Sequence, residues 1–189
     1  MMWRFGVYLS LVFWLSACSV VPERRVEEYQ LAAMQSLQQQ KRWSLEGRLA
    51  LTDEKDSVSV SIVWRHEENQ DDIELVGPLA QGRVKIAVTV DQVVVDDGGN
   101  RKVFYGQPDE VVAEQLSVDM PVSALRFWVL GVNDPKHSFV EQPNGFYQDG
   151  WLIKYPEMQQ SNAGSLPKKM TAQKNKTRIK LIVDQWDLS

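Results

Sequence analysis

The chain has a single cysteine, Cys18, and only two histidines, among its 189 residues. One cysteine cannot form an intramolecular disulfide, so no covalent bridge supports the fold. His66 and His137, with no further thiolate, are too few for a zinc site of the usual kind. We therefore expect neither a bound metal nor any other cofactor.

Basic residues are also in the minority, with 21 Lys and Arg against 25 Asp and Glu. Domains that bind nucleic acid present a basic face, so we expect no nucleic-acid partner. The same balance gives no strong attraction to an anionic membrane surface, so any membrane attachment must come from a separate anchor.

Long apolar runs are absent too. The apolar segment at residues 5–15 is shorter than the ~20 residues that a membrane-spanning helix needs. Arg4 precedes it and Leu15-Ser16-Ala17-Cys18 closes it, which is the pattern of a bacterial lipoprotein signal. In that pattern Cys18 is lipidated and becomes the mature N-terminus, and Ser19 at the next position favours the outer membrane.

These features divide the chain into three parts. We expect residues 1–17 to be a signal peptide, residues 18–25 to be the lipidated N-terminus with a linker, and residues 26–189 to be one domain. The alternative is an ordinary signal peptide followed by an incidental buried thiol at Cys18.

Most of the chain from Trp43 onward alternates apolar and polar residues. This period of two is typical of antiparallel strands that have one covered and one solvated face. Residues 158–165 are polar and are expected to form a loose connection. Strands are predicted around residues 43–51, 58–64, 73–75, 84–90, 93–95, 102–105, 137–141, 145–148, 151–155, 168–173 and 177–186.

Three segments have helical spacing instead. Residues 26–41 contain neither Gly nor Pro and place apolar residues on one face. A proline and two acids open the second segment, residues 108–116. A proline also opens the third, residues 122–130, which Gly131 ends. The third segment is apolar on nearly all sides, so we expect it to be buried.

These elements predict a mainly β fold of the α+β class, with about ten or eleven antiparallel strands in meander order. A single sheet of that size tends to curl. Its concave face must then be filled by side chains, by a helix or by a ligand. The helix at residues 122–130 fits a plug or a lid, and a filled barrel and a ligand cavity remain equally compatible with the pattern.

Five short segments of the chain have distinctive sequences. They are Trp43-Ser44-Leu45-Glu46-Gly47-Arg48-Leu49, Leu75-Val76-Gly77-Pro78-Leu79, Met120-Pro121-Val122-Ser123-Ala124-Leu125-Arg126-Phe127-Trp128-Val129-Leu130-Gly131, Gly150-Trp151 and Leu166-Pro167-Lys168-Lys169-Met170. Together with the lipoprotein signal and the terminal strand, and in this order, they resemble the LolB family of outer-membrane lipoproteins.

The resemblance implies a curved antiparallel half-barrel covered by helices, with an apolar cavity that takes the acyl chains of lipoproteins. It implies a protein on the periplasmic face of the outer membrane. There it accepts acylated cargo from a LolA-type periplasmic carrier and inserts it into the inner leaflet of the bilayer. We also expect a monomer without enzymatic activity.

The resemblance further implies a membrane-insertion loop. In the family, a leucine that follows a proline on a protruding loop is tied to insertion, and it matches Leu79 after Pro78. Ala80 departs from the glycine that is common in this loop.

The apolar pattern and the resemblance together indicate the residues of the acyl-binding cavity and its lid. They are Val60, Ile62, Trp64, Leu125, Trp128, Val129 and Leu130. Each tryptophan taken alone is more typical of a core than of a cavity wall. Arg48 and Arg126 lie among apolar residues and are expected to pair with acids or reach solvent, with contact to cargo headgroups as the lesser alternative.

Two other functions stay open. A non-catalytic structural or assembly-scaffold lipoprotein with a filled barrel is the main alternative. Catalysis has little support, because Ser123 lacks a G-x-S-x-G elbow and the pair Asp71-Asp72 lies in a predicted solvated turn. A dispersed carboxylate pair of the glycosidase type is the remaining enzymatic possibility.

Overall fold

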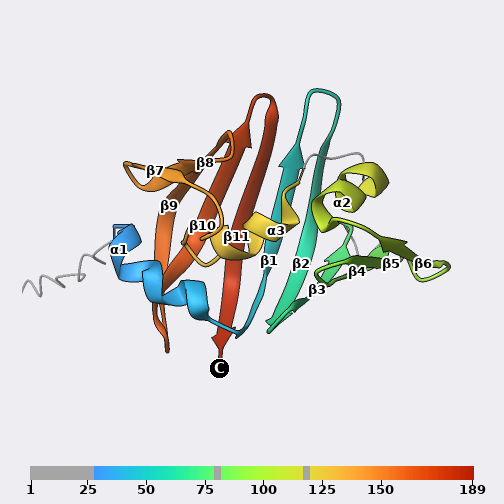
Figure 1. Ribbon diagram of the computed structural model, residues 1–189, viewed down its shortest axis with the longest axis horizontal. Helices are drawn as coiled ribbons and strands as arrows, with labels where there is room; N and C mark the ends of the chain where they lie inside the picture. Colours follow the sequence, from blue (N-terminus) through green and yellow to red (C-terminus); the bar gives the residue numbers. More distant parts are fainter. Residues whose placement is uncertain (1–27, 79–81, 117–119) are drawn as a thin grey trace, which may run out of the picture.

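The computed structural model describes residues 28–78, 82–116 and 120–189 (Figure 1). The expectations for the signal peptide, Cys18, the linker and Leu79 fall outside these ranges. Within the described ranges, no helix combines the length and the apolar composition that crossing a membrane requires.

One antiparallel sheet of eleven strands forms the body of the protein, in the order β6-β5-β4-β3-β2-β1-β11-β10-β9-β8-β7. The strands are β1 Arg42–Thr52, β2 Ser57–Glu67, β3 Gln70–Val76, β4 Arg83–Val88, β5 Gln92–Asp96, β6 Arg101–Tyr105, β7 Phe139–Gln142, β8 Gly145–Gln148, β9 Trp151–Ser161, β10 Gly164–Lys174 and β11 Thr177–Leu188. The described helices are α1 Leu31–Met34, the 3-10 helix η1 Gln35–Gln39, α2 Pro108–Leu116 and α3 Val122–Trp128.

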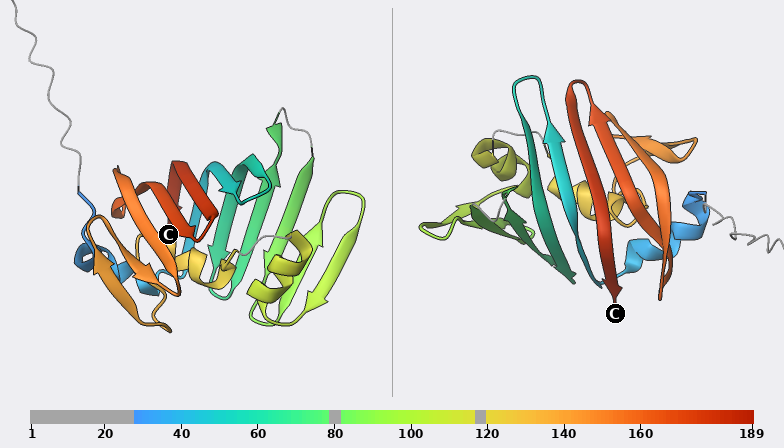
Figure 2. Two further views of the ribbon diagram at one scale, coloured as in Figure 1. Left: turned by 90° about the horizontal axis from the view of Figure 1, so that it is seen from above. Right: turned by 180° about the vertical axis from the view of Figure 1, so that it is seen from behind.

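The order of the strands reflects two meanders joined in the middle of the sheet. Strands β1 to β6 run outward to one edge, β7 to β11 run back from the other edge, and β1 pairs with β11. The chain must therefore cross from the β6 edge to the β7 edge, and it does so through α2 and α3. Both helices lie against the concave face of the curved sheet (Figures 1 and 2).

Tight turns keep the meanders in register. Asn144, Asp149 and Asn175 have φ angles of 58°, 52° and 52° in the turns that join β7–β8, β8–β9 and β10–β11. Asparagine and aspartate tolerate this left-handed region because their side chains bond locally to the backbone. The predicted fold class, a curved antiparallel half-barrel with covering helices, is confirmed, and the sheet is open.

Two predicted elements differ from the structure. Residues 158–165 are not a loose connection, because β9 and β10 continue through them and Ser161 pairs with Gly164. The helix expected at residues 26–41 is only α1 followed by η1. Tertiary bonds hold this short segment: the Tyr29 hydroxyl donates to the Gly131 carbonyl oxygen at 2.9 Å, and the Gln38 amide donates to the Asn133 carbonyl oxygen at 3.1 Å.

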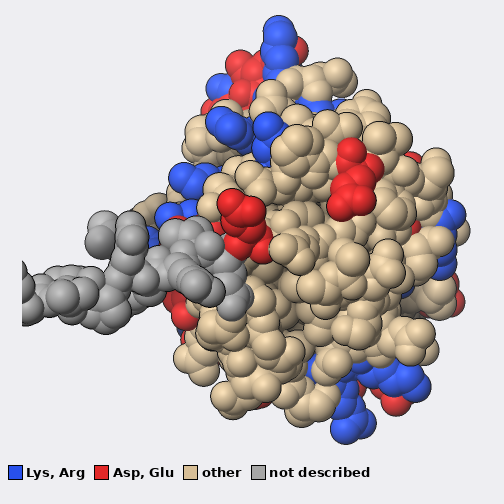
Figure 3. All heavy atoms as spheres, turned by 90° about the vertical axis from the view of Figure 1, so that its left-hand side faces the viewer, with Lys and Arg blue, Asp and Glu red and all other residues tan. Residues whose placement is uncertain are grey.

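Seen from the side that carries α1 and β7, much of the visible surface is uncharged (Figure 3). Val140 on β7 and Tyr147 on β8 are paired across the hairpin and are both exposed. They form an apolar patch at this edge of the sheet.

Candidate functional site

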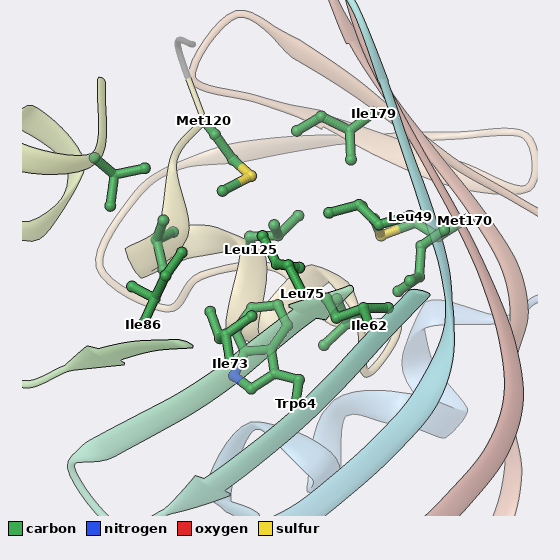
Figure 4. Close-up of a pocket in the computed structure, with 14 residues that line it drawn as sticks. Leu49, Ile62, Trp64, Ile73, Leu75, Ile86, Met120, Leu125, Met170 and Ile179 are labelled. Carbon is green, nitrogen blue, oxygen red and sulfur yellow. The ribbon is translucent and has the colours of Figure 1, made fainter. Parts of the chain in front are cut away.

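An apolar cavity lies between the concave face of the sheet and helices α2 and α3 (Figure 4). Its walls contain no charged side chain. It is lined by Leu49, Ile62, Trp64, Ile73, Leu75, Ile86, Val112, Met120, Val122, Leu125, Val129, Met170, Ile179 and Leu181.

Strand register explains why the sheet contributes so many of these residues. Ile73 on β3 lies opposite Trp64 on β2 and opposite Ile86 on β4. Leu49 on β1 lies opposite Leu181 on β11 in the same way. Directly opposed residues share one face of a sheet, so the alternating apolar positions of successive strands form one continuous apolar surface.

The cavity has little free space in this structure. The free space inside it is about 20 Å³, which is roughly the room that one water molecule needs. The rest of the volume between helices and sheet is filled by side chains. Any molecule larger than water would need side chains or helices to move.

Four of the predicted cavity residues line this space: Ile62, Trp64, Leu125 and Val129. Val60 lies on the same face, opposite Leu49, and packs at the edge of the core without lining the cavity. Trp128 and Leu130 do not line it either. Helix α3 is apolar on nearly all sides, and its sequence alone does not indicate which side faces the cavity.

Trp128 instead anchors the end of α3. It is fully buried, and its indole Nε1 donates to Oε1 of Gln148 at 2.9 Å. The hydroxyl of Tyr155 donates to the Trp128 carbonyl oxygen at 2.7 Å. The Trp128 carbonyl oxygen also accepts a hydrogen bond from the Gly131 amide at 3.0 Å, so the polar groups of Trp128 that are buried at the helix end are satisfied.

Two tyrosines hold this region as hydrogen-bond donors. Tyr29 stacks on Tyr155 with ring centroids 4.3 Å apart. Burial raises the pKa of the Tyr29 phenol above its ordinary value, with a smaller contribution from Glu141. Burial also raises the pKa of the Tyr155 phenol, and Tyr29 adds to that shift. Both phenols therefore remain protonated donors at neutral pH.

Leu130 lies in a second, more open cleft on the other side of α3. This cleft, named here the η1–α3 cleft, has a volume of about 430 Å³. It is lined by Leu37, Gln38, Gln39, Gln40, Lys41, Trp43, His66, Glu68, Arg126, Phe127 and Leu130. Helix α3 thus separates an apolar cavity from a mixed apolar and polar cleft.

A buried carboxylate, Asp71, lies beside this cleft. It is 3% exposed, and its Oδ1 accepts a hydrogen bond from Trp64 Nε1 at 2.9 Å and lies 2.8 Å from Nδ1 of His66. Arg126 Nη1 lies 3.9 Å from Oδ2 of Asp71. The expectation that Asp71 is solvated in a turn is wrong, because β3 begins at Gln70 and the β2–β3 pairing turns the side chain inward opposite His66.

The sequence pattern missed Asp71. It also missed the cavity residues contributed by β1, β3, β4, α2, β10 and β11, together with Met120 and Val122. A signal for Met170 and Ile179 was present, since both occupy apolar positions of alternating segments. Nothing local linked Asp71 to His66 and Arg126, because the last of these comes from a distant helix.

The predicted insertion loop is described only at its two ends. Pro78 is exposed, and the Gly77 amide donates to the Gly82 carbonyl oxygen at 3.0 Å. Gly82 has a φ of 73°, which favours glycine. Leu79 lies between these ends, outside the described residues.

The fold and the cavity define a class of protein: an open antiparallel half-barrel that encloses an apolar cavity beneath its covering helices. The chain belongs to the LolB family, because the family model described as outer membrane lipoprotein LolB matches residues 41–186. Membership makes it an outer-membrane lipoprotein of the Lol pathway.

Individual relatives agree with the family model. The outer-membrane lipoprotein LolB of Halorhodospira halophila is 28% identical over 192 residues, which cover 97% of this chain and 94% of that protein. The LolB of Marinomonas sp. is 27% identical over 195 residues and covers both chains completely. The LolB of Thiobacillus denitrificans is 29% identical, covering 97% of each. These names describe a lipoprotein and none of them names an enzyme.

A solved structure shares the fold alone. The crystal structure of a DUF1329 family protein from Desulfovibrio piger has a TM-score of 0.54 to this chain at 6% sequence identity. The match covers 84% of this chain and 90% of that one.

Proposed function

We propose that the protein accepts the acyl chains of lipoproteins from a LolA-type periplasmic carrier and inserts this cargo into the inner leaflet of the outer membrane. The observation that carries the proposal is the uncharged lining of the cavity beneath α2 and α3. Burying an acyl chain there is favourable by ~0.8 kcal/mol for each methylene group.

The energetics of transfer need no nucleotide. If the cavity binds the acyl chains ~1.4 kcal/mol more tightly than the carrier does, the equilibrium already favours cargo on this protein tenfold. The same apolar character suits a site that opens and closes, because contacts between apolar side chains are non-directional. An entering acyl chain replaces the contacts that Leu125 and Val129 lose when α3 moves away from the sheet, while the bonds of Trp128 hold the end of the helix.

Attachment and insertion depend on two residues outside the described ranges. Lipid on Cys18 tethers the body to the membrane, and more than one acyl chain anchors far better than one. Leu79, beside the exposed Pro78, enters the bilayer interface, where full burial of a leucine is worth roughly 1.5–3 kcal/mol. That free energy is too small for anchoring and sufficient to orient a tethered body or to disturb lipid packing as cargo leaves.

A fluorescent acyl probe tests the cavity. Leu75 lines it from β3 and is only half-buried, so Leu75→Gln should fold. A polar amide in the apolar wall costs about 1–3 kcal/mol, which predicts roughly tenfold weaker probe binding. The control is Val103→Gln, at an exposed position on β6. Unchanged probe binding by a folded Leu75→Gln variant would contradict the assignment of this cavity.

The small free volume of the cavity favours one second candidate. A permanently filled half-barrel, with about 20 Å³ of free space, fits a structural or assembly-scaffold lipoprotein that binds only protein partners. A wild-type protein that folds and binds no acyl probe at any concentration supports this candidate and removes the first.

A further inference from the structure

The η1–α3 cleft contains an arginine with unused hydrogen-bonding capacity. The Nε of Arg126 is buried and has no hydrogen-bond partner among the described residues. Its Nη1 approaches Asp71 only to 3.9 Å, which is too long for a hydrogen bond. A guanidinium carries five N–H donors, and leaving a buried one unpaired is costly.

Asp71 makes no hydrogen bond to these donors. Its Oδ1 accepts a hydrogen bond from the Trp64 indole and lies 2.8 Å from Nδ1 of His66, and Asp71 is not among the residues that line the cleft. Its negative charge offsets part of the desolvation of Arg126, whose side chain is 26% exposed. The Arg126 guanidinium also lies over the ring of Phe127, 4.9 Å from its centroid, which is a favourable cation–π distance.

Charge in the cleft favours one anionic group. Lys41 and Arg126 are its cationic residues, and Glu68 is the single carboxylate in its lining. An anion held by Arg126 is attracted by both cations and repelled by Glu68 and by the nearby Asp71, so the cleft suits one negative charge better than two.

The remaining walls favour an apolar body attached to that anion. Leu37, Trp43, Phe127 and Leu130 line the cleft, and its volume of about 430 Å³ falls in the range of small-molecule sites. A free phosphate ion would leave most of this space and all of the apolar wall unused.

We propose that the η1–α3 cleft binds an amphiphile with a single anionic headgroup, a phosphate or a carboxylate, whose oxygens accept hydrogen bonds from Arg126 while its apolar part packs on Phe127 and Leu130. This site is separate from the acyl cavity, since α3 lies between the two. The proposal does not depend on acyl transfer.

The test uses the mature lipidated protein in phosphatidylcholine nanodiscs, with hexyl phosphate as the probe. The side-chain Nε–H resonance of Arg126 reports binding at the site by NMR. Hexyl phosphate should shift this signal in a saturable manner, with inorganic phosphate and the neutral hexyl glucoside each binding at least tenfold more weakly. Equal binding of inorganic phosphate would reduce the site to a free-anion site and overturn the proposal.

Two variants follow the same binding by calorimetry. Arg126→Gln should weaken hexyl phosphate binding at least tenfold. Lys41→Gln changes an exposed residue and should weaken binding several-fold, which provides an independent test in case Arg126→Gln folds poorly. The charge-matched control is Arg83→Gln, whose ion pair with Glu74 lies on β4 and β3, outside the cleft lining. Unchanged affinity in both cleft variants overturns the proposal. Acyl-probe binding in the cavity should stay normal in both, which separates this result from a failure of the proposed function.

Discussion

The side-chain carbonyl of Gln148 accepts a hydrogen bond from the indole of Trp128 across 2.9 Å, deep in the protein. The same amide bonds to the backbone of Asp134 in both directions and donates to the His137 carbonyl oxygen. All four hydrogen-bonding positions of a fully buried amide are therefore used. This single side chain on β8 ties the end of α3 and the segment after it to the sheet.

Replacing Gln148 by Leu should destabilise the fold strongly. The change leaves the Trp128 indole and the Asp134 amide buried without their partners, and each such group costs about 1–3 kcal/mol. We expect a loss of about 3 kcal/mol or more in the free energy of unfolding, measured by urea denaturation. Gln173→Leu, at an exposed position of β10, should change it by less than about 0.5 kcal/mol. Equal stability of the two variants would contradict the structural role of Gln148.

Gly47 marks a second position where backbones meet closely. The register between β1 and β11 shifts between Glu46 and Gly47, and a Cβ at residue 47 would lie 2.1 Å from the Ile182 carbonyl oxygen. Gly47→Ala should therefore displace β11 and lower the melting temperature by several degrees, as expected for a loss of about 2 kcal/mol. Gly99→Ala meets nothing closer than 3.6 Å and serves as the control. A wild-type melting temperature for Gly47→Ala would show that the bulge can shift at little cost.

Leu79→Glu tests the proposed insertion loop. A charge should abolish insertion into the bilayer interface without touching the core, so this variant should fold, receive lipoprotein from the carrier and fail to deliver it to liposomes. The assay compares carrier-to-protein transfer with cargo incorporation into liposomes. Val90→Glu, at an apolar position that is 78% exposed in another turn, should deliver normally. If the Leu79→Glu variant delivers cargo at the wild-type rate, or if it already fails to receive cargo from the carrier, the proposed role of Leu79 is wrong.

Cys18→Ala tests the anchor. The variant should lose lipidation and remain unprocessed by the lipoprotein route, whereas the same body behind an ordinary secretory signal should be a folded periplasmic protein. Mass spectrometry of the mature wild-type N-terminus checks the modification directly. An unmodified Cys18 in the mature protein would support the alternative of an ordinary signal peptide.

The local elements of this fold could be predicted from the order of the amino acids. The period of two predicted the strands because pairing buries alternate residues on one face of a sheet. The hairpin at residues 96–101 and the end of α3 at Gly131, whose φ is 89°, followed from residues that permit left-handed backbone. The five sequence segments, in their order, indicated the family, and the family resemblance implied the half-barrel.

Which apolar residues form the cavity, and which polar residues are buried, depends on packing between segments that are distant in the chain. Residues 122–130 are apolar on nearly all sides, so their periodicity did not distinguish Leu125 in the cavity from Leu130 in the η1–α3 cleft or from Trp128 at the anchor. That orientation is set by the crossing from the β6 edge to the β7 edge. Asp71 looked solvated because its partners include Arg126, 55 positions away in the chain, and contacts between segments so distant leave no local signal in the sequence.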